Sequence, residues 1–283
     1  MRVQAGDTRL FFDVEGSKLV PDGPAMRERP TVLLLHGGPG FDHTEFRPFG
    51  SALADVAQVI YLDHRGSGRS DRSGPERWNL DTWADDVRAF CDALDIERPV
   101  VLGSSFGGMV AQAYAARHPD HPAKLILVST TARLRLDRML VMFERLGGAR
   151  AAGVARRFFA DPRATFPEYI DVCFPLYRQS PPEQGAVERA VLHLDVGGYF
   201  VAGEMQTFDL RADLARVRCP TLVLSGDLDP FATTEDAREL AAALPPELVQ
   251  IRRFPSAGHA VLDDARAEAL AAIRAFLGAA RAA

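Results

Sequence analysis

The sequence predicts an α/β fold in which helices flank a mostly parallel central sheet. Short apolar runs with the length of buried parallel strands recur along the chain, at 31–35, 59–62, 100–102, 125–128, 221–224 and 248–252. Between them lie segments whose apolar residues repeat at helical spacing, at 80–94 and 234–244. Strands that alternate with helices in this way are typical of a parallel sheet covered by helices.

The remaining elements complete this pattern. The stretch 10–14 is rich in strand-forming residues and is expected to belong to an antiparallel edge hairpin. The helix expected over 80–94 has its apolar residues on one stripe, and Asn79 or Asp81 is placed to cap its first turn. After the last strand, a C-terminal helix presents one apolar face, formed by Leu270, Ile273, Phe276 and Leu277.

Residues 132–212 interrupt the alternation. They carry many arginines among apolar residues at helical spacing, and five prolines divide the segment into short pieces, at 162, 167, 175, 181 and 182. We therefore expect a helical cap inserted over the core, with 1–131 and 213–283 forming the α/β core. The arginines are expected to form a solvated face of the cap helices.

Composition limits the classes of function. The formal net charge of −5 offers no electrostatic reason to bind nucleic acid or an anionic membrane. No signal-peptide pattern opens the sequence, and no apolar run approaches the roughly 18 residues of a membrane span, so a cytoplasmic protein is expected. The three cysteines lack the spacing of metal ligands and are expected to be buried thiols.

The stretch 103–107, Gly-Ser-Ser-Phe-Gly, carries the strongest functional signal. It follows the apolar run 100–102 and precedes a helical pattern, which puts Ser105 at the apex of a strand–turn–helix unit. Such a turn exposes the serine hydroxyl as a nucleophile. Glycine suits positions 103 and 107 because a Cβ atom there would crowd the strand against the helix.

A serine hydroxyl also needs a base and a group that orients the base. In enzymes with this turn, the acid and then the histidine follow the serine along the chain, each in a loop after a strand. Asp227 and Asp229 both follow the run 221–224, and His259 follows the run 248–252. His259 is the expected base; other histidines are expected to be structural, turn or surface residues, among them His36, His43, His64, His118 and His121.

The same chemistry requires donors for the oxyanion that develops on the substrate. One is expected to be the backbone N–H of Phe106, which follows the nucleophile. The second should come from the loop after the strand 31–35, where Gly37 and Gly38 leave room for a ligand beside the backbone. We expect Gly38 to supply it.

Two further motifs indicate a family. The sequence His-Gly-Gly-Pro-Gly occupies residues 36–40, and the sequence Asp-His-Arg-Gly-Ser-Gly-Arg-Ser occupies residues 63–70. With the serine turn, they make nearly the whole chain resemble the α/β-hydrolase superfamily and, within it, the proline iminopeptidase group. The resemblance implies an α/β-hydrolase fold, a Ser-Asp-His triad, and no metal or cofactor. The Gly-x-x-Asp pattern of the family favours Asp229 over Asp227 as the acid.

The resemblance also implies a substrate. Proline iminopeptidases remove an N-terminal residue from peptides, and acidic residues of their cap bind the free amino terminus. In this chain Glu204 is the first candidate for that role and Asp195 the second. The alternative for Glu204 is a solvent-exposed or helix-pairing residue.

Three classes of function follow from these residues. The leading hypothesis is a serine hydrolase that forms an acyl-enzyme with a small molecule or short peptide, as a proline iminopeptidase does. The alternative is an esterase, a lactonase or a hydrolase of carbon–carbon bonds. A receptor-like binding module is less favoured because it has no need of all three triad groups. A haloalkane dehalogenase or epoxide hydrolase would carry aspartate in place of Ser105.

Overall fold

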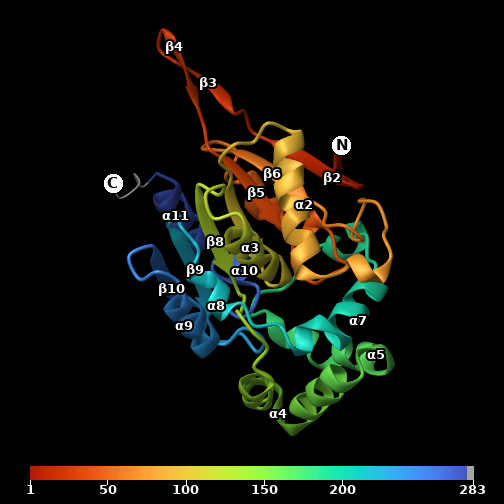
Figure 1. Ribbon diagram of the computed structural model, residues 1–283. Helices are drawn as coiled ribbons and strands as arrows, with labels where there is room; N and C mark the ends of the chain where they lie inside the picture. Colours follow the sequence, from red (N-terminus) through yellow and green to blue (C-terminus); the bar gives the residue numbers. More distant parts are fainter. Residues whose placement is uncertain (279–283) are drawn as a thin grey trace.

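The computed structural model describes residues 1–278, apart from the side chain of Val187, and an eight-stranded sheet lies at its centre (Figure 1). The strand order is β1 (Arg2–Ala5), β2 (Thr8–Glu15), β6 (Gln58–Leu62), β5 (Thr31–Leu35), β7 (Val100–Ser104), β8 (Lys124–Val128), β9 (Thr221–Gly226) and β10 (Val249–Phe254). Strands β1 and β2 form an antiparallel hairpin, β2 runs antiparallel to β6, and the strands from β6 to β10 are parallel. The predicted α/β fold is confirmed.

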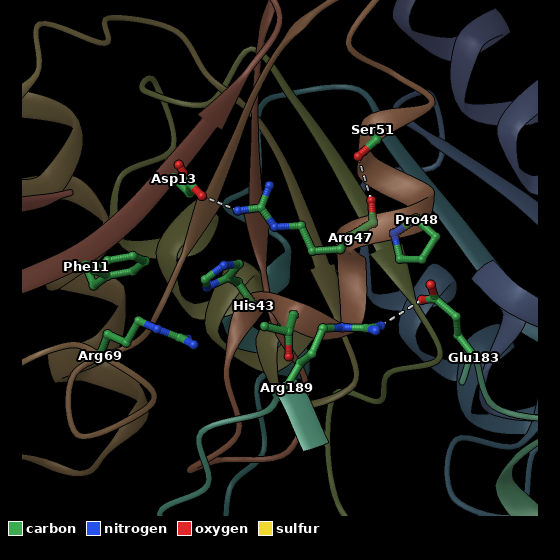
Figure 2. A pocket seen from close by; sticks show the side chains of 10 residues that line it. Phe11, Asp13, His43, Arg47, Pro48, Ser51, Arg69, Glu183 and Arg189 are labelled. Atoms are coloured by element: carbon green, nitrogen blue, oxygen red, sulfur yellow. Dashed lines mark hydrogen bonds and ion pairs between the residues drawn. The ribbon is translucent and has the colours of Figure 1, made fainter. Parts of the chain in front are cut away.

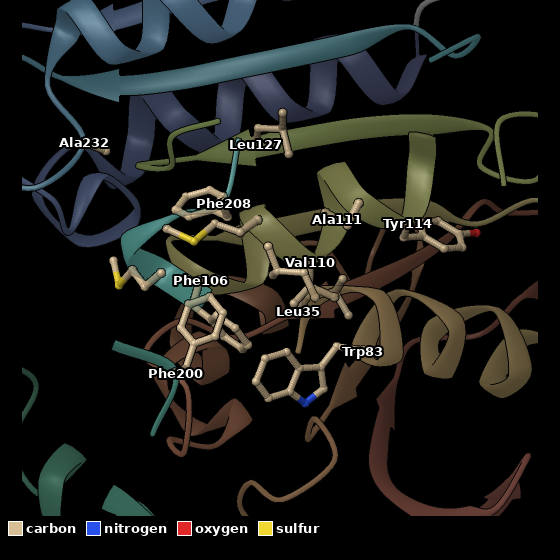
Figure 3. Packing of buried hydrophobic residues seen from close by; sticks show 14 of the residues in the cluster. Leu35, Trp83, Phe106, Val110, Ala111, Tyr114, Leu127, Phe200, Phe208 and Ala232 are labelled. Atoms are coloured by element: carbon tan, nitrogen blue, oxygen red, sulfur yellow. The ribbon is translucent and has the colours of Figure 1, made fainter. Parts of the chain in front are cut away.

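Helices cover both faces of the sheet because successive side chains of a buried strand point to opposite sides. In β5, Leu33 and Leu35 belong to the same apolar cluster as α2 (Leu80–Ala93), α3 (Phe106–Arg117) and α9 (Thr234–Ala243). Val32 and Leu34 belong to the opposite cluster, with α1 (Arg47–Ser51), α10 (Val261–Asp264) and α11 (Arg266–Gly278). Figure 3 shows the first cluster, where side chains of β5, α2 and α3 meet: Leu35, Trp83, Phe106 and Val110.

Local signals account for the helix boundaries. The Asn79 side chain accepts a hydrogen bond from the backbone N–H of Thr82, so Asn79 caps α2. Thr233 and Asp236 form a reciprocal capping box at the start of α9.

A short hairpin of β3 (Leu19–Asp22) and β4 (Ala25–Glu28), which the sequence pattern did not predict, projects away from the sheet (Figure 1).

Helices make up most of residues 132–212. The segment contains α4 (Leu136–Ala160), α5 (Pro162–Val172), the 3-10 turn η3 (Phe174–Tyr177), α6 (Ala186–Arg189), α7 (Leu194–Ala202) and the 3-10 turn η4 (Glu204–Gln206), and it leads into α8 (Arg211–Leu214). Within residues 1–278, the β-pairing of this segment is an isolated bridge between Arg133 and Asp209. The bridge holds the start and the end of the segment side by side. No helix among residues 1–278 is long and apolar enough to cross a bilayer.

The arginines near the start and end of this segment differ from the expected solvated face. Arg133, Arg135, Arg138 and Arg211 all form ion pairs with Glu239 of α9, and their side chains are only 23–39% exposed. Since Glu239 lies on a helix of the core, these pairs connect α4 and α8 to the sheet domain. The sequence pattern showed the four arginines, but it did not show that Glu239 forms ion pairs with all of them.

Candidate active site

Ser105 lies in the turn between β7 and α3, with φ 51° and ψ −117°. A positive φ is unusual for a residue that has a side chain, and such strain is found mainly where the surrounding structure enforces it. A Cβ atom on Gly103 would overlap the carbonyl oxygen of Gly107, and one on Gly107 would overlap that of Leu35. The two glycines therefore let α3 approach the sheet closely enough to hold Ser105 in this conformation.

His259 is paired with Asp229. The two carboxylate oxygens lie 2.8 and 3.0 Å from the Nδ1 atom of His259. The backbone N–H groups of Phe231 and Ala232 also donate to Asp229, which is fully buried. A carboxylate only accepts hydrogen bonds, so Nδ1 carries the imidazole proton and Nε2 is left as a proton acceptor.

Asp227, the competing acid, lies in a different environment. Its carboxylate pairs with Arg253 at 2.8 Å and accepts a hydrogen bond from the hydroxyl of Thr234. The structure therefore brings Asp229, and not Asp227, to His259. The residues Ser105, Asp229 and His259 follow the carboxyl ends of β7, β9 and β10, which are parallel strands that end at the same edge of the sheet.

Gly38 and Phe106 both have unused donors. Within residues 1–278 neither backbone N–H has a hydrogen-bond acceptor, whereas the N–H of Gly37 donates to Glu45 Oε1 at 2.7 Å. Gly38 has a φ of 43°, a conformation that glycine adopts without strain. Gly37 lies against the nucleophile turn, since a Cβ atom on it would be 3.3 Å from Ser105 Cβ. Gly38 therefore belongs to a loop that adjoins the serine.

Known proteins resemble this chain over most of its length. The family model described as the alpha/beta hydrolase fold matches residues 30–265, most of the chain. The chain belongs to the α/β-hydrolase family. It is 30% identical over 258 residues to the putative carbamate hydrolase RutD of Caulobacter sp. (strain K31), which covers 88% of each chain. It is 27% identical over 245 residues to the proline iminopeptidase PfmaB of Pestalotiopsis fici, covering 82% of this chain and 86% of that one.

Solved structures of other proteins have a fold similar to that of this hydrolase. A proline iminopeptidase of Mycobacterium smegmatis matches with a TM-score of 0.80 at 24% identity, covering 98% of this chain and 97% of that one. The enol-lactonase from Burkholderia xenovorans LB400 matches with a TM-score of 0.74 at 24% identity, covering 99% and 100%. The resemblance to proline iminopeptidases, first indicated by the motifs at 36–40 and 63–70, is confirmed.

Buried histidines brace the loops of the hydrolase. His36 Nε2 accepts the backbone N–H of His64 at 3.2 Å, and His36 Nδ1 lies 2.9 Å from the Gly37 carbonyl. Burial lowers the pKa of both imidazoles, so they stay neutral. His43 Nδ1 lies 2.7 Å from Asp63. His43, His64 and His121, which were expected to be turn or surface residues, are buried, since each is at most 7% exposed.

The two carboxylates expected in the cap have other partners. Glu204 Oε2 accepts the backbone N–H of Leu80 at 2.9 Å, so this side chain caps the start of α2. Burial raises the pKa of Glu204. Asp195 forms an ion pair with Arg72, and its side chain is 56% exposed. Sequence spacing did not show that both groups have partners outside the 132–212 segment.

Glu45 is a site residue that sequence reasoning missed. It lies in the 3-10 turn η1 (His43–Phe46), in the loop that follows β5, and its carboxylate contacts Gly37. The residue as a whole is exposed, but the protein atoms packed around its carboxylate raise the pKa of that group to about 7. The sequence could have indicated Glu45 by its position, because it lies in the same loop as Gly38, nine residues after His36.

Residues of the 132–212 segment contact the loops after β5 and β10. The ring of Tyr177 lies 4.8 Å from that of His259, and the Tyr177 carbonyl accepts the N–H of Ala260 at 3.0 Å. On the other side, the N–H of His193 donates to the Gly40 carbonyl at 2.6 Å. A Cβ atom on Gly40 would overlap the carbonyl of His193. The segment thus contacts both the loop after β5 and the loop after β10.

A separate cavity of about 670 Å³ lies beside η1 and β2 and contains none of the residues Ser105, Asp229 and His259. Figure 2 shows its lining, in which the side chains come from the core and from the segment around α6. Its arginines are already neutralised by ion pairs, Arg47 with Asp13, Arg69 with Asp42 and Arg189 with Glu183. The cavity therefore offers no unpaired charge to a ligand.

Proposed function

We propose that the protein is a serine hydrolase that forms an acyl-enzyme on Ser105 with a small carbonyl substrate. The observation that supports this most is the contact of 2.8 Å between His259 Nδ1 and the buried Asp229. It orients an imidazole whose Nε2 accepts protons, in the loop that follows β10. Ser105 is presented by a strained turn at the same edge of the sheet.

These positions support the following reaction. His259 Nε2 removes the proton of the Ser105 hydroxyl as its oxygen attacks the carbonyl carbon of the substrate. The N–H groups of Gly38 and Phe106 stabilise the oxyanion, and His259 then donates the proton to the leaving group. Water attacks the acyl-enzyme in the second half of the reaction, with the same imidazole as base. Asp229 accepts the hydrogen bond from Nδ1 and so keeps the proton on that nitrogen.

The preferred substrate class is the aminoacyl amide or short peptide that proline iminopeptidases cleave. The motif at 36–40 and the similarity to proline iminopeptidases support it. An esterase or lactonase is the second candidate, because Glu204 and Asp195 already have partners in the core. Similarity to an enol-lactonase in fold and to a putative carbamate hydrolase in sequence is compatible with that candidate.

The proposal is tested by the substitution Ser105→Ala. The variant is expected to fold normally and to lose roughly 10⁴-fold or more of kcat, since removal of the nucleophile disables the whole triad. A fluorophosphonate should label the wild-type protein covalently at Ser105 and leave the variant unlabelled. Labelling of the variant at the wild-type rate would exclude Ser105 as the nucleophile.

The substrate class is tested on a matched panel. Aminoacyl anilides, short-chain aryl esters and lactones are compared by kcat/KM in the wild-type protein and in Ser105→Ala. Turnover of the anilides supports the peptidase, whereas turnover of the esters and lactones alone supports the second candidate.

A further inference from the structure

Glu45 and Ser105 lie on either side of Gly37. A Cβ atom on Gly37 would be 3.3 Å from Ser105 Cβ and 3.4 Å from each carboxylate oxygen of Glu45. Glu45 is exposed and Ser105 is half-buried, so solvent reaches both side chains. The carboxylate is thus part of the immediate surroundings of the proposed nucleophile.

The carboxylate of Glu45 is not neutralised by the protein. Within residues 1–278 it accepts a hydrogen bond from the Gly37 N–H through Oε1, and no arginine or lysine lies at ion-pair distance. The charged groups that influence it are Asp42 on the same loop, His259 after β10 and Asp263 in α10. Of these three side chains, only His259 can carry a positive charge. Glu204 likewise accepts one backbone N–H, whereas Asp195 is already paired with Arg72.

An unpaired carboxylate in this place has a consequence for catalysis. When a substrate reacts, a second negative charge develops at the N–H groups of Gly38 and Phe106, next to Gly37. Two like charges this close repel, and the surrounding protein screens them less than bulk water does. A positive charge on the substrate between them would remove the repulsion and supply the missing partner of Glu45.

We propose that Glu45 selects substrates that carry a positively charged group next to the scissile carbonyl. This inference rests on the proposed function, because it takes Ser105 as the nucleophile. Glu45 acts as a specificity residue: it contacts the cationic group and takes no part in the transfer of protons. An ammonium group of the acyl portion fits this position, whether primary or fully methylated.

The variant Glu45→Gln separates this role from a merely structural one. Glutamine retains an oxygen that accepts the Gly37 N–H, and it removes the charge. Two aryl esters with the same leaving group serve as substrates, one trimethylammonioacetyl and one tert-butylacetyl. Their acyl groups have the same shape and differ by one positive charge. The ratio of their kcat/KM values cancels any general loss of activity.

At pH 8, Glu45→Gln is expected to lower the ratio of cationic to neutral kcat/KM by at least about tenfold. In the wild-type protein the ratio should rise with pH around 7, because burial raises the pKa of Glu45 to about 7 and the ionised form attracts the cation. Glu204→Gln is the matched control and should leave the ratio unchanged. The proposal is overturned if Glu45→Gln keeps the wild-type ratio, or if Glu204→Gln lowers it as much.

Labelling of Ser105 distinguishes a failure of the role proposed for Glu45 from a failure of the proposed function. If fluorophosphonate labels Ser105 and the ratio is unaffected by Glu45→Gln, the serine hydrolase stands and the role of Glu45 is wrong. If Ser105 is not labelled at all, the proposed function itself fails. Should both esters turn over slowly, protection of Ser105 from labelling by the corresponding amides gives the ratio of their affinities, which Glu45→Gln is expected to change in the same direction.

Discussion

Each residue of the proposed triad depends on contacts made by its neighbours. Ser105 keeps a positive φ because Gly103 and Gly107 leave no Cβ atom between β7 and α3. Asp229 keeps its orientation because the N–H groups of Phe231 and Ala232 donate to it. Fixed hydrogen bonds of this kind hold a catalytic group in place before the substrate arrives.

The two aspartates of the turn after β9 should therefore differ in effect. Asp229→Asn is expected to lower kcat by roughly 10²–10⁴-fold, because an amide cannot hold the His259 tautomer as a carboxylate does. Asp227→Asn should change kcat by less than about threefold, since Asp227 serves a partly exposed pair with Arg253. Steady-state kinetics of the two purified variants checks this ranking, and the reverse order would assign the acid to Asp227.

Among the elements, ion pairs to Glu239 connect α4 and α8 to α9. Glu239 gathers four arginines, three from 133–138 and one from α8. Burial alone would raise the pKa of Glu239, but the hydrogen bond from Arg138 and the charge of Arg133 together hold it below its usual value. A carboxyl with a lowered pKa stabilises the fold above its unfolded pKa of 4.5 and loses that contribution as the pH falls further.

Glu239→Gln should accordingly loosen the attachment of α4. We expect a loss of about 1–2 kcal/mol at pH 7, with faster amide hydrogen exchange in 136–160. The difference from wild type should shrink below pH 4.5 and at high salt, where the native charge is neutralised or screened. Glu235→Gln, on the same helix but paired only with the exposed Arg238, is the control. Equal exchange in both variants would show that the ion pairs do not anchor α4.

The whole molecule is joined by a few buried polar links between its layers. Arg65, in the loop after β6, donates to Asp86 of α2 and to Asp7 in the turn between β1 and β2. Arg65 and Asp86 are 3% and 6% exposed, so both charges are withdrawn from water. Such a pair stabilises the fold little in net terms, but removing the Asp86 charge leaves the buried Arg65 with the exposed Asp7 as its counter-charge.

Asp86→Asn should therefore destabilise the entire fold. The expected loss is about 2–3 kcal/mol in the free energy of unfolding, or roughly 5–10 °C in Tm for a chain of this size. Asp81→Asn on the same helix is the comparison, since Asp81 is 73% exposed and its pair with Arg117 is worth little. Thermal unfolding followed by circular dichroism measures both. A Tm of Asp86→Asn within 2 °C of wild type would contradict this account.

The sequence predicts much of this architecture because the relevant signals are local. The apolar runs gave the positions of the six parallel strands, and the helical stripe of 80–94 gave α2 with its Asn79 cap. The turn at 103–107 and the loop that carries His259 could be placed for the same reason. The hairpin of β3 and β4 was missed because its short strands are mostly exposed and have no apolar run.

By itself, the sequence determined the α/β fold, the serine turn and the order of the candidate catalytic loops, because contiguous residues encode each of them. Only the tertiary structure decided which carboxylate meets which partner. Asp229 and not Asp227 reaches His259, Glu204 caps a helix 124 residues away, and Glu45 lies beside the serine turn through Gly37. These contacts join distant parts of the chain, and they depend on how the loops and helices pack around the end of the sheet.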